Sequence, residues 1–288
     1  MRLGINLPYR RADGGGPNAG EIMARAGLIE GIGFDGIWIG DTVGRWDFAG
    51  LDTLQWLTAA ACGTERIELG TAVLQIPLRP PVELAQRLMT LHALSGGRFV
   101  AGIGSGSTAK DFEAVGVPFE DRFRLLRDGA AMIKGLLNGE TVDGKAINPW
   151  PNVRGGPPIV IGAWGSGPWV ARAAKEYDGW MASGLNTSYN ALAEGIRRYR
   201  EAGGTGRTLV ATINVNLRAP AESFDPDKSF NLNCPPKEAA ERLARVAEMG
   251  FDDVLCSRLN YSEADWTEED LRELRSLLPR DPKSRNAK

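Results

Sequence analysis

Residues 66–107 read RIELGTAVLQIPLRPPVELAQRLMTLHALSGGRFVAGIGSGS, and this stretch decides the fold. Its first apolar run, Ile67–Leu74, has the length and the β-branched composition of a strand. The pair Pro80-Pro81 suits the first turn of a helix, and Val82–Leu94 then repeats apolar residues at helical spacing until two glycines end it. A second apolar run, Arg98–Gly104, predicts another strand. Together they predict a βαβ unit, in which a right-handed crossover joins two parallel strands.

Neither of these strands alternates apolar and polar residues, which is typical of strands that are buried on both faces. Parallel neighbours end at the same edge of a sheet, so Val73–Gln75 and Gly104–Gly106 are expected to lie side by side. We expect the chemistry of the protein at this shared edge.

Composition limits the classes of function. The 288 residues are 43% apolar and 24% charged, as in a globular protein with a sizeable core, and the net charge of -2 gives no argument for nucleic-acid binding. No apolar run reaches the roughly twenty residues of a membrane span, and no signal-peptide core follows Met1, so we expect a cytoplasmic protein. The cysteines Cys62, Cys234 and Cys256 are expected to be buried thiols, and the single histidine, His92, leaves no histidine cluster for a metal site.

The strand–helix alternation continues along the whole chain. The predicted strands are Leu3–Asn6, Gly36–Gly40, Ile67–Leu74, Arg98–Gly104, Pro158–Gly162, Asp178–Ser183, Leu209–Leu217 and Asp253–Cys256. The predicted helices are Gly20–Ile32, Leu51–Cys62, Val82–Leu94, Asp121–Leu137, Pro168–Glu176, Tyr189–Ala202, Pro236–Met249 and Trp266–Leu278. This pattern predicts an α/β fold, a (β/α)8 TIM barrel with loop insertions, as one domain over residues 1–279 followed by a polar tail, 280–288, expected to be disordered. A doubly wound parallel sheet is the alternative, because strand order cannot be read from one sequence.

Three short related sequences and two long loops stand between the predicted elements. Three related sequences, Gly33-Phe34-Asp35, Gly250-Phe251-Asp252 and Tyr177-Asp178-Gly179, each follow a helix and place an acidic residue before a strand. Two loops, residues 141–157 and 218–235, are longer than a connection needs. The second loop follows a strand, so in a barrel it belongs to the active rim and is a candidate lid.

The predicted strands end in residues that are poor in acid–base groups and rich in Gly, Ser and Asn. Such a rim suits the binding of a flat polar cofactor through backbone and amide hydrogen bonds. The strand-end residues are Asn6, Asp41, Thr42, Val73–Gln75, Gly104–Ser107, Gly162–Gly167, Ser183, Asn214, Asn216, Ser257 and Arg258.

Several of these residues have two interpretations. The glycine-rich segment Gly162–Pro168 before a helix predicts either a phosphate cradle or a flexible turn capped by Ser166. Arg258 is a second phosphate candidate or a solvated arginine, and Asp41 is a catalytic carboxylate or a loop cap. Glu113 faces either the pocket or solvent.

Two further patterns carry less weight. Gly102-Ile103-Gly104 follows a strand, as in a Rossmann motif, but Ser107 replaces the third glycine and the next clear helix begins only near Asp121. His92 falls on an outer helix and is expected at the surface or in packing rather than in catalysis.

Four strings resemble the bacterial-luciferase-like superfamily of flavin-dependent oxidoreductases. They are LGTAVLQIPLRPPVELAQ, LSGGRFVAGIGSG, FEAVGVPFEDR and IVIGAWGSGPWVARAAKEYDGWM, and the resemblance covers roughly residues 1–185. It implies a (β/α)8 barrel that binds FMN or the deazaflavin coenzyme F420 at the carboxyl-terminal rim.

The resemblance also implies roles for individual residues. It places a non-proline cis peptide at Ala72-Val73, under the flavin ring, with Thr71 before it. Gly104, Ser105 and Gly106 match a loop near the ring system, and Gly165 and Ser166 match the loop at the phosphate. Asp41 matches an acidic position, after which many deazaflavin-using relatives have histidine where this chain has Thr42. The remaining proton donors are then Asp41, Glu113, Tyr9 or water.

Two mechanisms follow from the resemblance. With FMN, a separate flavin reductase supplies reduced flavin, and oxygen and a small organic substrate react on it; with F420, a hydride passes directly between coenzyme and substrate. Trp46, Trp164 and Trp169 are candidates for an apolar substrate pocket or for the core. A homodimer is expected, and a non-catalytic barrel that binds a flavin or a phosphate ligand is the alternative function.

Overall fold

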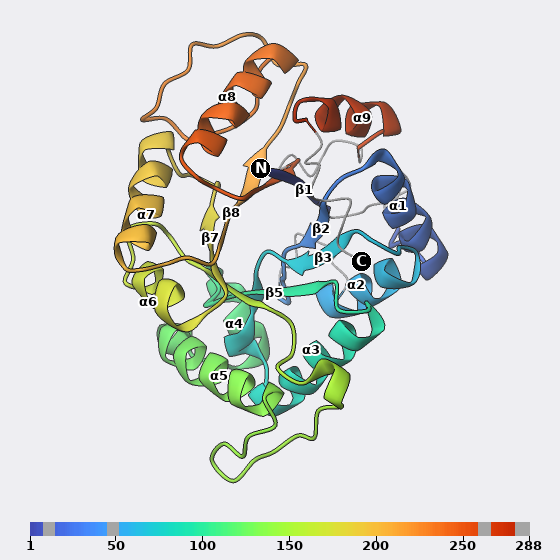
Figure 1. Cartoon of the computed structure of the whole chain (residues 1–288), viewed down its shortest axis with the longest axis vertical. Helices are drawn as coiled ribbons and strands as arrows, with labels where there is room; N and C mark the ends of the chain where they lie inside the picture. The colour runs from blue at the N-terminus through green and yellow to red at the C-terminus, as the bar shows by residue number, and fades with distance from the viewer. Residues whose placement is uncertain (8–14, 45–51, 259–265, 280–288) are drawn as a thin grey trace.

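The protein forms a closed barrel of parallel strands surrounded by helices (Figure 1). The computed structural model describes residues 1–7, 15–44, 52–258 and 266–279. Within them the strand order is β3-β2-β1-β9-β8-β7-β6-β5-β4, and β3 also pairs with β5, so the sheet closes on itself. A doubly wound sheet stays open, so the predicted (β/α)8 barrel is confirmed.

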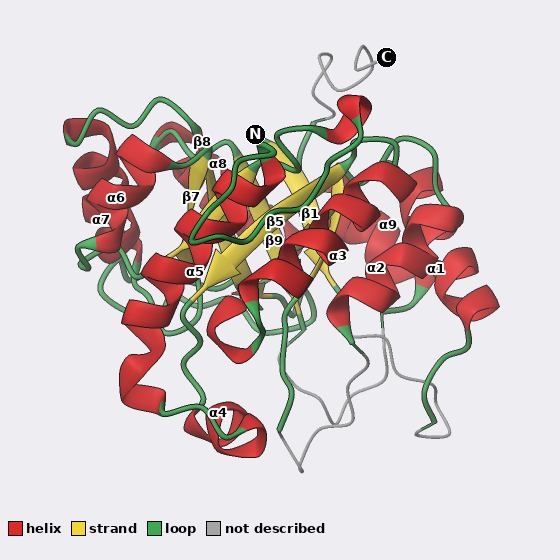
Figure 2. Ribbon diagram, turned by 90° about the horizontal axis from the view of Figure 1, so that it is seen from below, coloured by secondary structure: helices red, strands yellow, loops and turns green. Residues whose placement is uncertain are grey.

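The described elements follow the predicted alternation. The strands are β1 Arg2–Asn6, β2 Gly36–Ile39, β3 Glu68–Thr71, β4 Leu74–Gln75, β5 Phe99–Gly104, β6 Ile159–Gly162, β7 Gly179–Ser183, β8 Arg207–Asn214 and β9 Asp253–Ser257. The helices are α1 Ala19–Ile32, α2 Thr53–Cys62, α3 Pro81–Leu94, α4 Ala109–Val115, α5 Arg122–Leu137, α6 Trp169–Glu176, α7 Tyr189–Glu201, α8 Pro236–Glu248 and α9 Glu268–Ser276. Figure 2 shows α4 apart from the ring of helices, at one end of the barrel.

Two predicted strands differ from the structure, and one helix was not predicted. The single strand predicted at Ile67–Leu74 is two strands, β3 and β4, separated at Ala72-Val73, whose peptide bond is cis as the resemblance implied. The strand predicted at Leu209–Leu217 begins and ends earlier, and its pairing with β9 is irregular where Thr212 adopts a φ of 61°. Helix α4 was not predicted, because its 7 residues span too little chain to show a period.

Trp38 fills the inside of the barrel. Its side chain is 1% exposed and clusters with Val100, Val160, Met181, Leu209, Ala211 and Leu255, which face the axis from the other strands. A Cβ on Gly36 or Gly70 would come within 2.6 or 2.2 Å of the Trp38 indole, so these positions accept only glycine. The interior is therefore a packed core and not a pore.

Charged residues close the amino-terminal end of the barrel. Arg207, at the start of β8, donates two hydrogen bonds to Asp253 at 2.6 and 2.7 Å and two to Glu68 at 2.8 and 2.7 Å. Arg2 adds an ion pair to Glu68 at 3.2 Å. Burial alone would lower the pKa of Arg207, but hydrogen bonds and charges from Asp253 and Glu68 outweigh burial and raise it. The guanidinium is therefore fixed in its charged form.

The three repeated acidic residues have one common role. The Oδ2 atoms of Asp35, Asp178 and Asp252 accept the amide N–H at the start of a neighbouring strand, from Leu3 at 2.9 Å, Ile159 at 2.8 Å and Thr208 at 2.8 Å. Each carboxylate satisfies a backbone donor at the first or second residue of a strand, where the ladder begins. The acidic residues of these three related sequences thus fix the starts of strands and do not mark a catalytic site.

Candidate active site

The carboxyl-terminal mouth of the barrel has a flat apolar floor. Ala72 and Val73 pack against the cluster around Trp38 that fills the barrel. A Cβ on Gly104 would lie 2.7 Å from the Val73 side chain, and a Cβ on Gly162 would lie 2.4 Å from it. The two glycines therefore allow the Val73 side chain to fit between the ends of β5 and β6. Because Gly104 and Gly162 have no side chains, neither strand end projects into the mouth.

Small polar residues surround this floor. Asn6, Ser183 and Ser257 each follow an inward-facing residue by two positions, so they face the mouth from β1, β7 and β9. Asn214 ends β8 beside Ser257 and donates to Asn233 at 3.3 Å. Thr71 is not part of this ring: it is fully buried, and its hydroxyl donates to the Gly102 carbonyl at 2.7 Å.

Asp41 is held by an arginine that the sequence did not point to. Its side chain is 1% exposed and accepts two hydrogen bonds from Arg79, at 2.7 and 2.8 Å, and one from the Gln75 amide N–H at 3.0 Å. Burial lowers the pKa of Arg79, but the hydrogen bond and charge of Asp41 outweigh that effect and raise it. Both oxygens of Asp41 are therefore engaged within the protein.

A second carboxylate, Asp111 of α4, joins three segments of the mouth. It accepts hydrogen bonds from the Thr42 hydroxyl at 3.1 Å, from the Val43 and Gly44 amides at 3.3 and 3.0 Å, and from Gln75 Nε2 at 2.8 Å. Burial would raise the pKa of Asp111, but hydrogen bonds from Gln75, Gly44, Val43 and Thr42 outweigh burial and lower it.

The structure brings Thr42 to Asp111 and leaves Glu113 away from both. Glu113 lies on the exposed side of α4, two residues beyond Asp111. Residues two apart on a helix face in different directions, so only one of these two carboxylates can meet the mouth. Asp111 was missed because its partners are 36 to 69 residues away in sequence. The apolar Phe112 beside it was the only local sign that this short segment packs inward.

Gln75 links the two carboxylates and keeps one atom without a partner. Its Nε2 donates to the Asp41 carbonyl and to Asp111, both at 2.8 Å, which fixes the orientation of the amide. Its Oε1 is buried and accepts no hydrogen bond from the described residues. A Cβ on Gly106 would lie 2.2 Å from this oxygen, so the chain passes directly over it. Ser105 makes only a local contact, from its hydroxyl to the Gly106 carbonyl at 3.3 Å.

The loop before α6 offers backbone donors. Gly165 packs so closely on α7 that a Cβ there would lie 3.0 Å from Gly195 Cα, and the exposed Ser166 accepts a hydrogen bond from Arg198 at its carbonyl, at 3.1 Å. The amide N–H groups of Gly165 and Ser166 have no acceptor among the described residues. Ser166 does not cap α6, since Pro168 stands at the cap and no side chain bonds there.

Arg258 is paired with a carboxylate beyond the end of β9. It forms an ion pair with Asp270 of α9 at 2.9 Å and lies over the Trp266 ring at 4.3 Å. The arginine is thus oriented by α9, and its proposed phosphate contact would have to coexist with Asp270.

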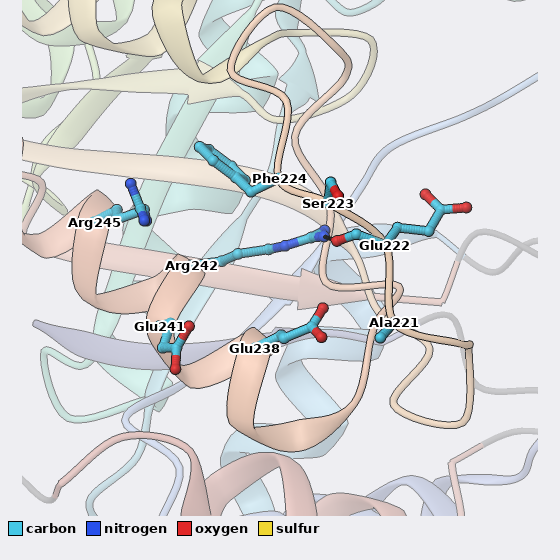
Figure 3. Close-up of a pocket in the computed structure, with 8 residues that line it drawn as sticks. All are labelled: Ala221, Glu222, Ser223, Phe224, Glu238, Glu241, Arg242 and Arg245. Atoms are coloured by element: carbon cyan, nitrogen blue, oxygen red, sulfur yellow. Dashed lines mark hydrogen bonds between the residues drawn. The ribbon is translucent and has the colours of Figure 1, made fainter.

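The candidate lid is packed against the protein. In residues 215–235, the β8–α8 segment, the Phe230 amide donates to the Thr187 carbonyl at 2.8 Å and the Leu232 amide to the Asn214 carbonyl at 2.8 Å. Arg242 of α8 is 7% exposed and donates to the Asn231 and Glu222 carbonyls at 3.0 and 3.1 Å. Figure 3 shows this arginine reaching from α8 toward Ser223 and Glu222, across a pocket of about 350 Å³.

The other candidate residues lie away from the mouth or outside the description. His92 is half-buried in the last turn of α3, and burial lowers the pKa of its imidazole. Cys234 and Cys256 are buried, but Cys62 is exposed, contrary to expectation, because it ends α2 on the outer face.

The tryptophans proposed for a substrate pocket lie in different surroundings. Trp164 is 50% exposed beside the mouth, whereas Trp169 is partly buried against the hydrophobic core. Tyr9 and Trp46 lie outside the described residues.

Comparison with known proteins decides the family. The family model described as luciferase-like monooxygenase matches residues 1–212. The chain belongs to the luciferase-like monooxygenase family. This confirms the resemblance drawn from the four sequence strings.

Two curated members of the family carry the same name, F420-dependent glucose-6-phosphate dehydrogenase. The protein from Beutenbergia cavernae is 32% identical over 257 residues, 81% of this chain and 73% of the relative. That from Rhodococcus erythropolis is 32% identical over 251 residues, 81% of this chain and 69% of the relative. Among solved structures, the monooxygenase RslO1 from Streptomyces bottropensis superposes with a TM-score of 0.77 at 18% identity, covering 96% of this chain and 97% of its own.

The mouth of this luciferase-like barrel has the features that a flat cofactor needs. The floor between Gly104 and Gly162 is level, and the Gly165 and Ser166 amides have no acceptor within the described residues. In the described part of the chain, no helix is long and apolar enough to cross a membrane.

Proposed function

We propose that this protein is an F420-dependent oxidoreductase that transfers a hydride between the coenzyme and a small organic substrate. The proposal rests on the sequence similarity to the relatives from Beutenbergia cavernae and Rhodococcus erythropolis, both of which are named as F420-dependent dehydrogenases. The glycine-floored mouth supports it, because a planar ring needs a surface without protruding side chains.

The proposed cofactor site uses backbone groups more than side chains. The ring system would lie on Ala72 and Val73, beside Gly104, Ser105 and Gly106, and the phosphate would meet the Gly165 and Ser166 amides at the start of α6. Bound F420 supplies a carbon centre that exchanges a hydride with the substrate. Asn6 and Gly162 complete the rim, and Arg258 is kept as a candidate for the outer part of the coenzyme.

The described residues around the floor orient the ligands and exclude water, and neither of their two carboxylates is free to act as a base. Asp41 is engaged by Arg79 and Gln75, and Asp111 by Gln75 and the residues 42–44. The Thr42 proton is donated to Asp111, so Thr42 presents an oxygen acceptor. We therefore assign proton exchange to water at the mouth or to Tyr9, with Asp41 and Thr42 as positioning groups and Glu113 outside the reaction.

An FMN-dependent monooxygenase is the second candidate. The lack of an uncommitted acid–base side chain among the described mouth residues favours it, because there the protein mainly orients the substrate and excludes water. This route needs a separate flavin reductase, which the hydride route does not. A non-catalytic barrel that binds the cofactor alone remains the third candidate.

A paired titration of the purified protein tests the proposal. F420 and FMN are added separately and binding is followed by cofactor absorbance and fluorescence. We expect F420 to bind at least about tenfold more tightly than FMN, a difference of about 1.4 kcal/mol. Preferential FMN binding would move the assignment to the monooxygenase route, and binding of neither would refute both.

The substrate is then sought by following F420 reduction. Glucose 6-phosphate, the substrate in the relatives' name, is tested first, followed by a panel of alcohols. Reduction by any of them would separate an enzyme from a barrel that only binds the coenzyme. Light scattering on the same samples tests the expected homodimer.

A further inference from the structure

Asp111 accepts more hydrogen bonds than the cap of a short helix requires. It stands in the first turn of α4, is 1% exposed, and accepts all four of its hydrogen bonds from outside that helix. In the part of the chain that the structure describes, it forms no ion pair with a lysine or arginine. A buried carboxylate in this state depends on its hydrogen-bond donors, and three of the four come from the consecutive residues 42–44.

Residues 42–44, here called the mouth wall, fit α4 at a second point. Gly44 lies so close to the helix that a Cβ there would be 2.4 Å from the Ala114 side chain and 2.6 Å from the Lys110 carbonyl. The mouth wall thus meets one face of α4 through Asp111 and again through Gly44. Steric fit and hydrogen bonding therefore independently place Gly44 against α4.

Gln75 connects this arrangement to the floor. It follows Val73 by two residues, and its amide spans from the Asp41 carbonyl to Asp111. The carboxylate of Asp111 is therefore the point where the mouth wall, the floor and α4 meet (Figure 2 shows α4 at this end of the barrel). Loss of this one group would remove the side-chain hydrogen bonds that join α4 to the mouth wall and to Gln75.

We propose that Asp111 is a positioning residue, which holds the mouth wall in place beside the cofactor floor and fixes the Thr42 hydroxyl as an acceptor. This inference rests on the proposed function for the identity of the cofactor, and on the structure alone for the order of the mouth wall. Asp111 does not touch the reacting atoms; it acts through residues 42–44.

Amide hydrogen exchange and F420 titration test this role in four variants. Asp111→Ala removes all four hydrogen bonds, and we expect the Val43 and Gly44 amides to exchange at least about tenfold faster and F420 to bind about tenfold more weakly. Asp111→Asn keeps an oxygen for the mouth wall but turns a donor toward Gln75 Nε2, so its effects should be smaller in both measurements. Thr42→Val removes one bond and should leave the two amides protected. Asp128→Asn, an exposed position on α5, is the matched control.

The outcomes separate the inference from the proposed function. Unchanged exchange at Val43 and Gly44 in Asp111→Ala would overturn the positioning role, and so would faster exchange with unchanged cofactor affinity. If the unmodified protein prefers FMN, the same comparison is made with FMN, and only the proposed function fails. If Asp111→Ala does not fold, Asp111→Asn decides through the same two measurements, with loss of protection expected and wild-type protection contradicting the role.

Discussion

Asp41 and Asp111 show how the same residue type at one rim can be fixed in two ways. Asp41 is compensated by a cation, Arg79, with both oxygens engaged at 2.7 and 2.8 Å. Among the described residues, Asp111 accepts hydrogen bonds from neutral donors and from no cation. Charge compensation decides what a substitution costs, because a buried charge that loses its single cationic partner is left in a low-dielectric site.

Arg79→Met tests whether Asp41 is a structural carboxylate. Removal of the guanidinium leaves Asp41 buried and unpaired, and we expect a loss of about 3–5 kcal/mol in the free energy of unfolding, measured by urea denaturation. The double variant Asp41→Asn with Arg79→Met should recover part of this loss, because no charge is then stranded. An additive double variant would show that the pair is not coupled. Turnover that survives Asp41→Ala would exclude Asp41 from the chemistry altogether.

Among elements, the β8–α8 segment is the place where an expected lid proves to be anchored. Its backbone bonds to residues 187 and 214, and Arg242 reaches across from α8 to donate hydrogen bonds to its carbonyls (Figure 3). A lid needs an element of low local stability, with few buried contacts. The buried Arg242 and its hydrogen bonds instead indicate that this segment has many stabilising contacts.

Arg242→Met should loosen this segment and leave the barrel intact. The variant loses three hydrogen bonds, to Asn231 and Glu222, and we expect residues 219–231 to be cleaved by a protease about tenfold faster than in the wild type. Arg245→Met is the control, because this exposed arginine only lies over the Phe224 ring at 5.0 Å. Equal cleavage rates in all three proteins would mean that the segment opens without breaking the Arg242 contacts.

The sequence predicted the elements because each repeats a local pattern, and it failed where the information is not local. Apolar periodicity located the long helices, and uninterrupted apolar runs located the buried strands. Helix α4 is too short for a period, and the break after β3 has no signal apart from the family resemblance. Arg79 was missed as a site residue because its partner Asp41 lies 38 positions away in the sequence. Asp111 was missed for the same reason, since Thr42 lies 69 positions away from it.

On the scale of the molecule, the barrel separates stability from chemistry at its two ends. The amino-terminal end holds the charged cluster of Arg207, Glu68 and Asp253, whereas the mouth holds a glycine floor and small polar residues, with the carboxylates of Asp41 and Asp111 bound at its edge. This division is expected of parallel barrels, in which the loops that follow the strands carry the site. The two ends should therefore respond independently to substitution.

Arg207→Met tests this separation. It leaves Glu68 and Asp253 close together with Arg2 as their one cationic partner in the described part of the chain, so we expect a loss of about 3 kcal/mol in unfolding free energy at pH 7. Burial already raises the pKa of Asp253 against the lowering effect of the Arg207 hydrogen bonds and charge, and without the guanidinium this pKa should rise further than in the wild type. The folded variant then binds more protons, so its deficit relative to the wild type should shrink as the pH is lowered from 7 toward 5. Urea denaturation at both pH values measures this.

The matched control is Arg218→Met, which removes an exposed ion pair to Glu273 and should cost at most about 1 kcal/mol at either pH. F420 affinity of the folded Arg207→Met protein should equal that of the wild type, because the cluster lies at the end of the barrel away from the mouth. A deficit that grows on acidification would mean that the carboxyls keep their charge without Arg207, through Arg2 or water. A change in F420 affinity with intact folding would contradict the independence of the two ends.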